Sequence, residues 1–171
     1  MILPAVRDPR LVTVRRGGSL SDADHRLLAA WAADCAEHVL PLFETEVPLD
    51  PRPRQALEAL RAWIRGDRPM MATRAAGGHA MGAARPLAGA ARFAAYAAGQ
   101  AACVAHVPEH DLGAAAYAIK ARWAASAPGE RVAAGRRERD RQRERLPAQV
   151  RALVLEDQER RDAICWSVFS T

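Results

Sequence analysis

The chain has 171 residues, enough for one domain whose hydrophobic core needs neither disulfides nor a structural metal. Half of the residues are apolar, only 5% are aromatic, and the formal net charge is +5, so nucleic acids and acidic proteins are partners to consider. Three widely spaced cysteines (Cys35, Cys103 and Cys165) argue against a disulfide framework and favour a reducing, cytoplasmic location.

Residues 1–19 are predicted to form a short extended arm. Residues 1–10 hold two prolines and several charges but no apolar run, so they do not resemble a signal peptide. Residues 11–14 (LVTV) are the one β-like stretch of the chain, and Gly17 and Gly18 end it.

A first helix is expected from Ser21 onward. Ser21 is a typical N-cap residue, and Asp24 at the third helical position makes a variant of the capping box. We expect this helix to run to about Leu40 or Phe43 and to end near Pro41 or Pro48, because proline disfavours continuation of a helix. Its apolar stripe repeats at helical spacing and comprises Leu27, Leu28, Trp31, Cys35, Val39 and Leu42.

The next two helices are marked by their ends. Asp50 and Pro51 supply an N-cap and a first helical position, and Gly66 stops the second helix. Its buried face is predicted to hold Leu57, Leu60, Trp63 and Ile64. Residues 70–84 are predicted to form a third helix, which the glycines at positions 77 and 78 weaken or kink.

A fourth helix is expected after Pro86. Every fourth residue is small, which lets a neighbouring helix approach closely; these residues are Ala91, Ala95, Gly99 and Cys103. Residues 86–105 form the longest weakly charged run, but they consist mostly of Ala and Gly. We therefore expect no membrane span here.

The remaining third of the chain is predicted to hold two helices and a charged connector. A helix follows Pro108 and turns Leu112, Ala115, Ile119 and Trp123 inward. Residues 129–146 are expected to be the connector, a solvated helix or loop, because charges of both signs alternate there. A final helix restarts at Pro147 with an apolar stripe of Val150, Leu153 and Val154, and Trp166 beyond it is also assigned to the core. Residues 1–171 are thus predicted to be a single all-α domain, a compact bundle of six or seven helices that could include solenoid-like pairs. Its Ala-rich ridges would suit packing within one chain or across a homodimer.

His106 and His110 are the sharpest candidates for metal binding. Two histidines four residues apart can share a metal when one helix face carries both. Pro108 lies between them and favours a helix start, which would place His106 before the helix and His110 inside it. We therefore expect both side chains to bond backbone groups at a helix junction, and we predict no metal and no cofactor.

A polar pocket between the central helices is a second candidate, suited to a small molecule. Its members would be His79, Arg92, Gln100, His106, His110 and Tyr117. We favour the alternative that Arg92 and Gln100 face water or cap carbonyl groups while small residues face the core. Cys35, three residues before His38, is interpreted as a buried small hydrophobe rather than a nucleophile. No catalytic residues are predicted.

An exposed charged surface is expected from Arg136, Arg137, Arg139, Arg141 and Arg143. Guanidinium groups bind phosphates, but acidic residues alternate with these arginines and can pair with them at i,i+3, as Glu138 with Arg141 and Asp140 with Arg143. No aromatic residue is interleaved to stack on bases. Nucleic-acid binding is therefore disfavoured, and the run is a candidate surface for a protein partner.

Four blocks of the chain carry a family resemblance. They are residues 11–43, residues 51–66 with their Ala62-Trp63 and Arg65-Gly66 pairs, residues 98–118, and residues 157–169. They follow one another in order and cover most of the chain. In this arrangement the chain resembles the immunity-5-like family of small helical immunity proteins from bacterial polymorphic toxin systems.

The resemblance implies a protein that binds and neutralises a cognate toxin by protein–protein contact, without catalysis. The resemblance assigns no catalytic residues to this chain. His106 and His110 lie within the matching blocks, which either a shared fold or a shared polar pocket would explain. Because inhibitors of basic nucleases are expected to be acidic and this chain is basic, we do not expect its toxin to be a strongly cationic nuclease bound through its active-site face. A small-molecule-binding protein or enzyme that uses the central pocket is the alternative.

Overall fold

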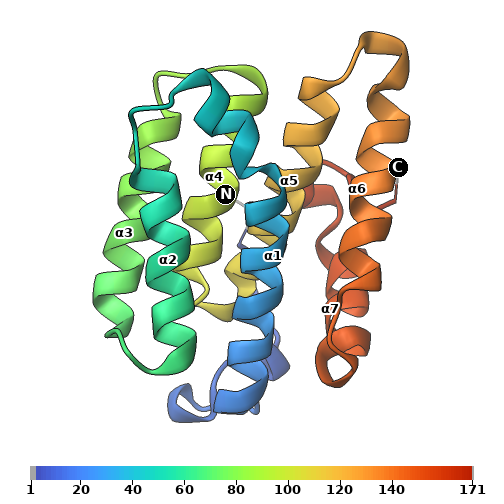
Figure 1. The fold of residues 1–171 in the computed structure, drawn as a ribbon. Coiled ribbons are helices and arrows are strands. Elements are labelled where there is room, and N and C mark those ends of the chain that lie inside the picture. The colour runs from blue at the N-terminus through green and yellow to red at the C-terminus, as the bar shows by residue number, and fades with distance from the viewer. Residues whose placement is uncertain (1–2, 171) are drawn as a thin grey trace.

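The computed structural model describes residues 3–170, which contain seven α-helices and no β-strand (Figure 1). The all-α prediction is confirmed. The helices are α1 (Asp22–Glu46), α2 (Arg52–Arg65), α3 (Met70–Ala84), α4 (Gly89–Cys103), α5 (Asp111–Ala125), α6 (Arg131–Glu144) and α7 (Ala148–Arg161). Five short 3-10 turns lie between or beside them: η1 (Pro9–Leu11), η2 (Val14–Arg16), η3 (Pro108–His110), η4 (Pro128–Glu130) and η5 (Ala163–Cys165).

The segment before α1 is less extended than predicted. The turns η1 and η2 leave only Val12 and Thr13 of the predicted β-like run extended, and one isolated parallel bridge joins Thr13 to Leu20. Asp8 caps η1 by accepting a hydrogen bond of 2.8 Å from the Arg10 backbone amide. Leu11 is fully buried, so this segment packs on the bundle and the expected β-like run is wrong outside its two middle residues.

Helix α1 begins where the sequence predicts and ends later. Ser21 Oγ accepts a hydrogen bond from the Asp24 amide at 3.0 Å, which confirms the N-cap. The helix then continues through Pro41 to Glu46, so the predicted end near Pro41 is wrong and the alternative end near Pro48 agrees with the structure. A proline inside a helix costs about 3 kcal/mol. Burying Leu40 and Phe43 on either side of it contributes about 2 kcal/mol each, which is enough to carry the helix across.

Helix α4 occupies the centre of the bundle and contacts α1, α2, α3 and α5 (Figure 1). The predicted ridge of small residues is buried along its length. A Cβ built on Gly77 of α3 would lie 2.7 Å from the carbonyl oxygen of Gly99, so these two helices meet backbone to backbone. Although this region is the least polar of the chain, none of the helices within residues 3–170 has both the length and the apolar character that crossing a bilayer requires.

Helices α6 and α7 lie on the opposite side of α1 and α5 from α2 and α3 (Figure 1). Helix α6 packs against α5 and buries Ala134, Gly135, Glu138 and Gln142. The segment expected to be a charged connector is therefore largely a packed helix. Helix α7 contacts α1 and buries Val150 and Val154, as its apolar stripe predicts.

Candidate functional site

The six residues predicted to line a central pocket are spread over several places. Gln100 of α4 and His110 of η3 meet, with 2.7 Å between Gln100 Oε1 and His110 Nδ1. His79 is exposed on α3, in a shallow hollow shared with α2. Arg92 donates hydrogen bonds to the carbonyl oxygens of Arg85 and Leu87, the capping role that the alternative interpretation gives it. The cavity beside His106 and the hollow beside His79 each contain none of the other five.

The two histidines around Pro108 differ in their surroundings. His106 precedes η3 and lies 3.4 Å from the Arg16 guanidinium, whereas His110 ends η3 and faces α4. Burial lowers the pKa of His110 to about 4, with nearby positive charges adding to the effect, so its ring is neutral at pH 7. Within residues 3–170, no group of three or more His, Cys, Asp or Glu side chains is arranged to hold a metal.

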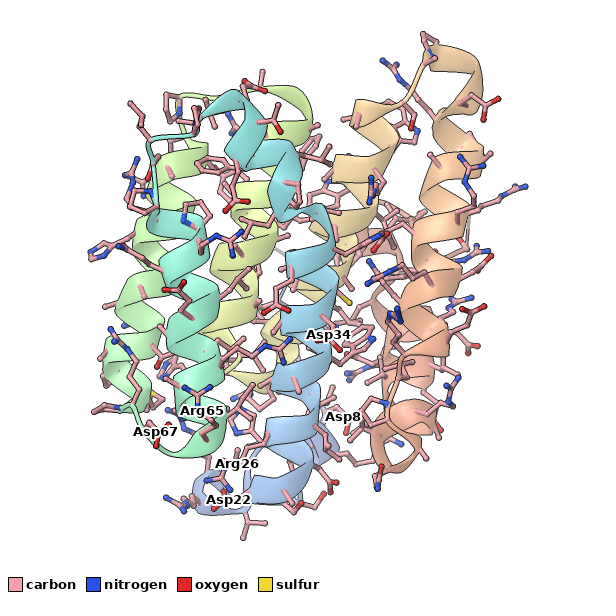
Figure 2. All side chains as sticks on the ribbon, viewed as in Figure 1. Asp8, Asp22, Arg26, Asp34, Arg65 and Asp67 are labelled. Atoms are coloured by element: carbon pink, nitrogen blue, oxygen red, sulfur yellow. The ribbon has the colours of Figure 1, made fainter. Side chains whose placement is uncertain are left out.

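His106 contributes to a small basic pocket of about 210 Å³ beside the first turn of α1. The His25 ring forms one wall; its Nε2 donates a hydrogen bond of 2.6 Å to the Val104 carbonyl oxygen, and it packs on Trp63 at 4.9 Å between centroids. Asp22 and Arg26, at the lower end of α1 in Figure 2, also line the pocket. An ion pair of 2.7 Å between Arg15 and Asp22 offsets part of its positive charge.

A buried ion network attaches α7 to the centre of the molecule. Arg161 is 1% exposed; its Nη2 lies 2.5 Å from Asp157 Oδ2 and 3.3 Å from Asp111 Oδ1. Its Nη1 donates a hydrogen bond of 2.8 Å to the Glu109 carbonyl oxygen. The buried Glu109 carboxylate in turn accepts a hydrogen bond of 2.7 Å from Arg7 Nε, so the network links α7, η3 and the N-terminal segment. Burial raises the pKa of Asp111, which shares Arg161 with a second carboxylate.

A second buried carboxylate lies inside the arginine-rich helix. Glu138 is 1% exposed and lies 2.6 Å from His38 Nδ1, while its other oxygen accepts a hydrogen bond of 2.9 Å from Gln142 Nε2. The predicted pairing with Arg141 is present at 3.6 Å. One face of α6 is thus bound to α1 rather than solvated.

The arginines of α6 therefore do not form one exposed surface. Arg136 and Arg137 are exposed, and Arg137 lies 3.9 Å from Glu130. The other three are only partly exposed: Arg139 pairs with Asp140 at 2.8 Å, Arg141 with Glu138, and Arg143 donates to the Gln158 side chain and the Phe169 carbonyl oxygen. The prediction of an exposed run was wrong for these three. Arg139 and Arg143 lie against the C-terminal turn, where both donate to the Phe169 carbonyl oxygen, and Arg141 lies beside Glu138 and His38.

An apolar groove of about 250 Å³ opens between α5, α6 and the C-terminal turn. We call it the tryptophan groove; its lining residues are Ile119, Lys120, Trp123, Val132, Gly135, Arg136, Trp166 and Val168. Trp123 is 40% exposed and Trp166 is 44% exposed. Trp123 was predicted to face inward, but Gly135 opposite it supplies no side chain to cover the indole.

The C-terminal turn presents Trp166 in an unusual backbone conformation. Trp166 and Ser167 have φ values of 59° and 55°, in the left-handed region that non-glycine residues seldom adopt, at a cost of roughly 1 kcal/mol each. The turn is held by Asp162, whose carbonyl oxygen accepts from the Ser167 amide at 2.8 Å and whose carboxylate accepts from the Phe169 amide at 2.9 Å. The Trp166 indole packs edge-on against Tyr117, with 5.1 Å between the ring centroids. Tyr117 therefore lies in an aromatic cluster rather than in a polar pocket.

Cations lie over both exposed indoles. Lys120 Nζ is 4.7 Å from the Trp166 ring centre, and the Arg131 guanidinium is 4.6 Å from that of Trp123. Sequence reasoning missed this groove because it assigned both tryptophans to the core. One available signal was that Trp166 lies beyond the last apolar residue of the α7 stripe.

A comparison with protein families gives one match. Residues 18–149 match the family model described as "Imm-5 like putative immunity protein", a span that runs from the end of the N-terminal segment to the start of α7. No curated protein and no solved structure gives a match. Since the matched span is about three quarters of the chain, the chain belongs to the Imm-5 like immunity protein family.

Proposed function

We propose that this chain is an immunity protein that binds a cognate bacterial toxin in the cytoplasm and neutralises it by protein contact, without catalysis. The observation that carries the proposal is the tryptophan groove, where Trp123 and Trp166 stand exposed beside cationic side chains. Trp and Arg are the residues in which binding hot spots of protein interfaces are enriched. Family membership supports the same function.

The cysteines support the location and the absence of thiol chemistry. Cys35, Cys103 and Cys165 are all free and buried, as is usual for proteins of a reducing compartment. Burial raises the pKa of Cys35 well above its ordinary value, and raises that of Cys165 to about 12. Because the thiolate is the reactive form, neither side chain is suited to act as a nucleophile.

The alternative of a small-molecule pocket has less support. It needs His79, Arg92 and His110 to converge, and these side chains lie in separate surroundings. A hydrogen bond between Gln100 and His110 also uses two polar groups that a ligand would otherwise contact.

Co-purification tests the proposal. The tagged chain is co-expressed with the product of the adjacent gene, and the eluate is measured by intact mass under native conditions. We expect a stoichiometric complex, and we expect co-expression to restore growth to cells that this gene product inhibits. A chain that elutes alone with added small-molecule mass would favour the pocket alternative, and a chain that neither binds nor restores growth would contradict the proposal for that partner.

A further inference from the structure

We infer that the tryptophan groove seats an acidic segment of the partner protein, with one large apolar side chain of that segment held between Trp123 and Trp166. This inference rests on the proposed function and adds to it the surface that is used and the chemistry that it recognises.

The size and lining of the groove suit a side chain rather than a small-molecule ligand. Its volume of about 250 Å³ lies below the range of roughly 300–1,000 Å³ typical of small-molecule sites. Ile119, Gly135 and Val168 give it apolar surface between the two indoles. Large apolar side chains inserted into such pockets are the usual anchors of protein interfaces.

The charged residues that line the groove are both positive. Lys120 and Arg136 line it, Arg131 lies over Trp123, and no acidic residue is among the lining residues. Within residues 3–170, none of these three cations has a carboxylate within 4.0 Å. A partner with carboxylates beside its apolar anchor would complement this charge.

Arg131 adds an unsatisfied donor at the same place. Its Nε is buried and has no hydrogen-bond partner among the described residues, although the guanidinium lies over the Trp123 ring. Buried donors are normally satisfied, and each one that is not requires an explanation. A carboxylate arriving at the edge of the groove would pair with the Arg131 guanidinium that carries this donor.

A second copy of this chain is a poorer occupant. In a two-fold symmetric dimer the same patch lies on both sides of the interface, so the patch that carries Lys120, Arg131 and Arg136 would face an identical, equally positive patch. Like charges brought together in this way repel one another, whereas an acidic partner does not incur this cost.

Two kinds of variant test the groove in the complex with the adjacent-gene product. Trp166→Ala removes an anchor and Arg136→Glu reverses a rim charge; both side chains are exposed, so the fold should be retained. The controls are Met71→Ala, which truncates another exposed large apolar residue, and Arg68→Glu, which reverses another exposed arginine; both lie in the α2–α3 region. We expect each groove variant to raise Kd by about tenfold or more and each control variant to change it by less than about twofold. Equal effects of groove and control variants would overturn the inference.

A peptide titration keeps the inference testable if that gene product does not bind. The probe is the acetylated and amidated peptide Glu-Asp-Leu-Phe-Asp-Glu, compared with a version in which Lys replaces each acidic residue. The indole N–H signals of the four tryptophans are followed by NMR. We expect the acidic peptide to shift the signals of Trp123 and Trp166 and to leave that of Trp31, which is 1% exposed, in place. Equal shifts with the basic peptide, or none with either, would contradict the inference.

Two further measurements address other occupants. Sedimentation with vesicles of phosphatidylcholine and phosphatidylserine would show whether the groove binds an anionic lipid surface instead. Analytical ultracentrifugation would show whether the chain dimerises. Vesicle binding or dimerisation that Trp166→Ala abolishes would assign the groove to that occupant and overturn our inference, while insensitivity of both to this variant supports it.

Discussion

The contact between α3 and α4 makes a prediction in which two neighbouring glycines respond with opposite sign. A Cβ added at Gly77 would lie 2.7 Å from the Gly99 carbonyl oxygen, 3.0 Å from Cys103 Sγ and 3.1 Å from Ala102 Cβ. The first of these atoms is backbone and the others belong to short buried side chains, so α3 or α4 must shift. A Cβ added at Gly78 would meet nothing within 4 Å.

The magnitude follows from two opposing effects. Replacing a helical glycine by alanine favours the folded state by about 1 kcal/mol. Overpacking a close contact costs about 1–3 kcal/mol. Because the nearest atom to the new Cβ at Gly77 is backbone and cannot move aside alone, we take the upper part of this range, about 2–3 kcal/mol. We therefore expect Gly78→Ala to stabilise the protein by close to the full 1 kcal/mol, and Gly77→Ala to destabilise it by about 1–2 kcal/mol once the helix gain is subtracted.

Thermal and urea unfolding followed by circular dichroism measure both changes. For a chain of this size 1 kcal/mol corresponds to about 2–4 °C, so Gly78→Ala should raise Tm by a few degrees and Gly77→Ala should lower it by about 5 °C. The two variants serve as controls for each other, since residue type, helix and neighbours in sequence are shared. Two shifts of the same sign and size would refute the backbone-to-backbone contact.

Three further results are expected. Arg161→Leu, which leaves two buried carboxylates without their cation, should destabilise the fold by about 3–5 kcal/mol in urea unfolding, while Arg160→Leu at a partly exposed site should cost less than about 1 kcal/mol. Burial holds the pKa of His110 at about 4, so an unfolded chain binds a proton between pH 6.5 and 4 that the folded chain does not. The stability that this residue contributes is therefore lost as pH falls through that range. Between pH 7 and 5 the free energy of unfolding should fall more for the wild type than for His110→Asn. The opposite contribution of Asp111 is present in both proteins, so equal losses would contradict the low pKa of His110. The buried thiols, including Cys165, should react slowly with a thiol reagent until the protein is unfolded, and rapid labelling of native protein would contradict their burial.

Features that depend on neighbours in sequence could be predicted. The cap at Ser21 depends on a side chain one turn away, and the stop at Gly66 depends on a left-handed backbone conformation that glycine adopts without strain. The small-residue ridge of α4 could also be predicted, because helical spacing alone places its members on one face. The family resemblance could also be found from the sequence, because its blocks are runs of neighbouring residues that follow one another along the chain.

Features that depend on distant parts of the chain could not be predicted. Glu138 lies in a run of alternating charges that is typical of a solvated helix, yet it is buried because His38, 100 residues earlier, meets it. Trp123 has the spacing of a core residue, and only the position of Gly135 on another helix leaves it exposed. The left-handed conformation at Trp166 and Ser167 could not be predicted, because neither residue is a glycine or an asparagine, the types that usually adopt it.

The buried charges explain how an exposed tryptophan can be held in one place. Buried ion pairs add little net stability compared with apolar residues of equal volume, but a broken pair is costly, so they disfavour alternative arrangements. Arg161 bonds to groups on η3 and on its own helix, which fixes where α7 ends, and Arg143 donates to the Phe169 carbonyl oxygen just beyond the groove. The C-terminal turn is thus fastened on both sides of Trp166 by directional bonds. A binding surface that is already ordered loses less conformational entropy on association, which favours tight binding through a groove of modest size.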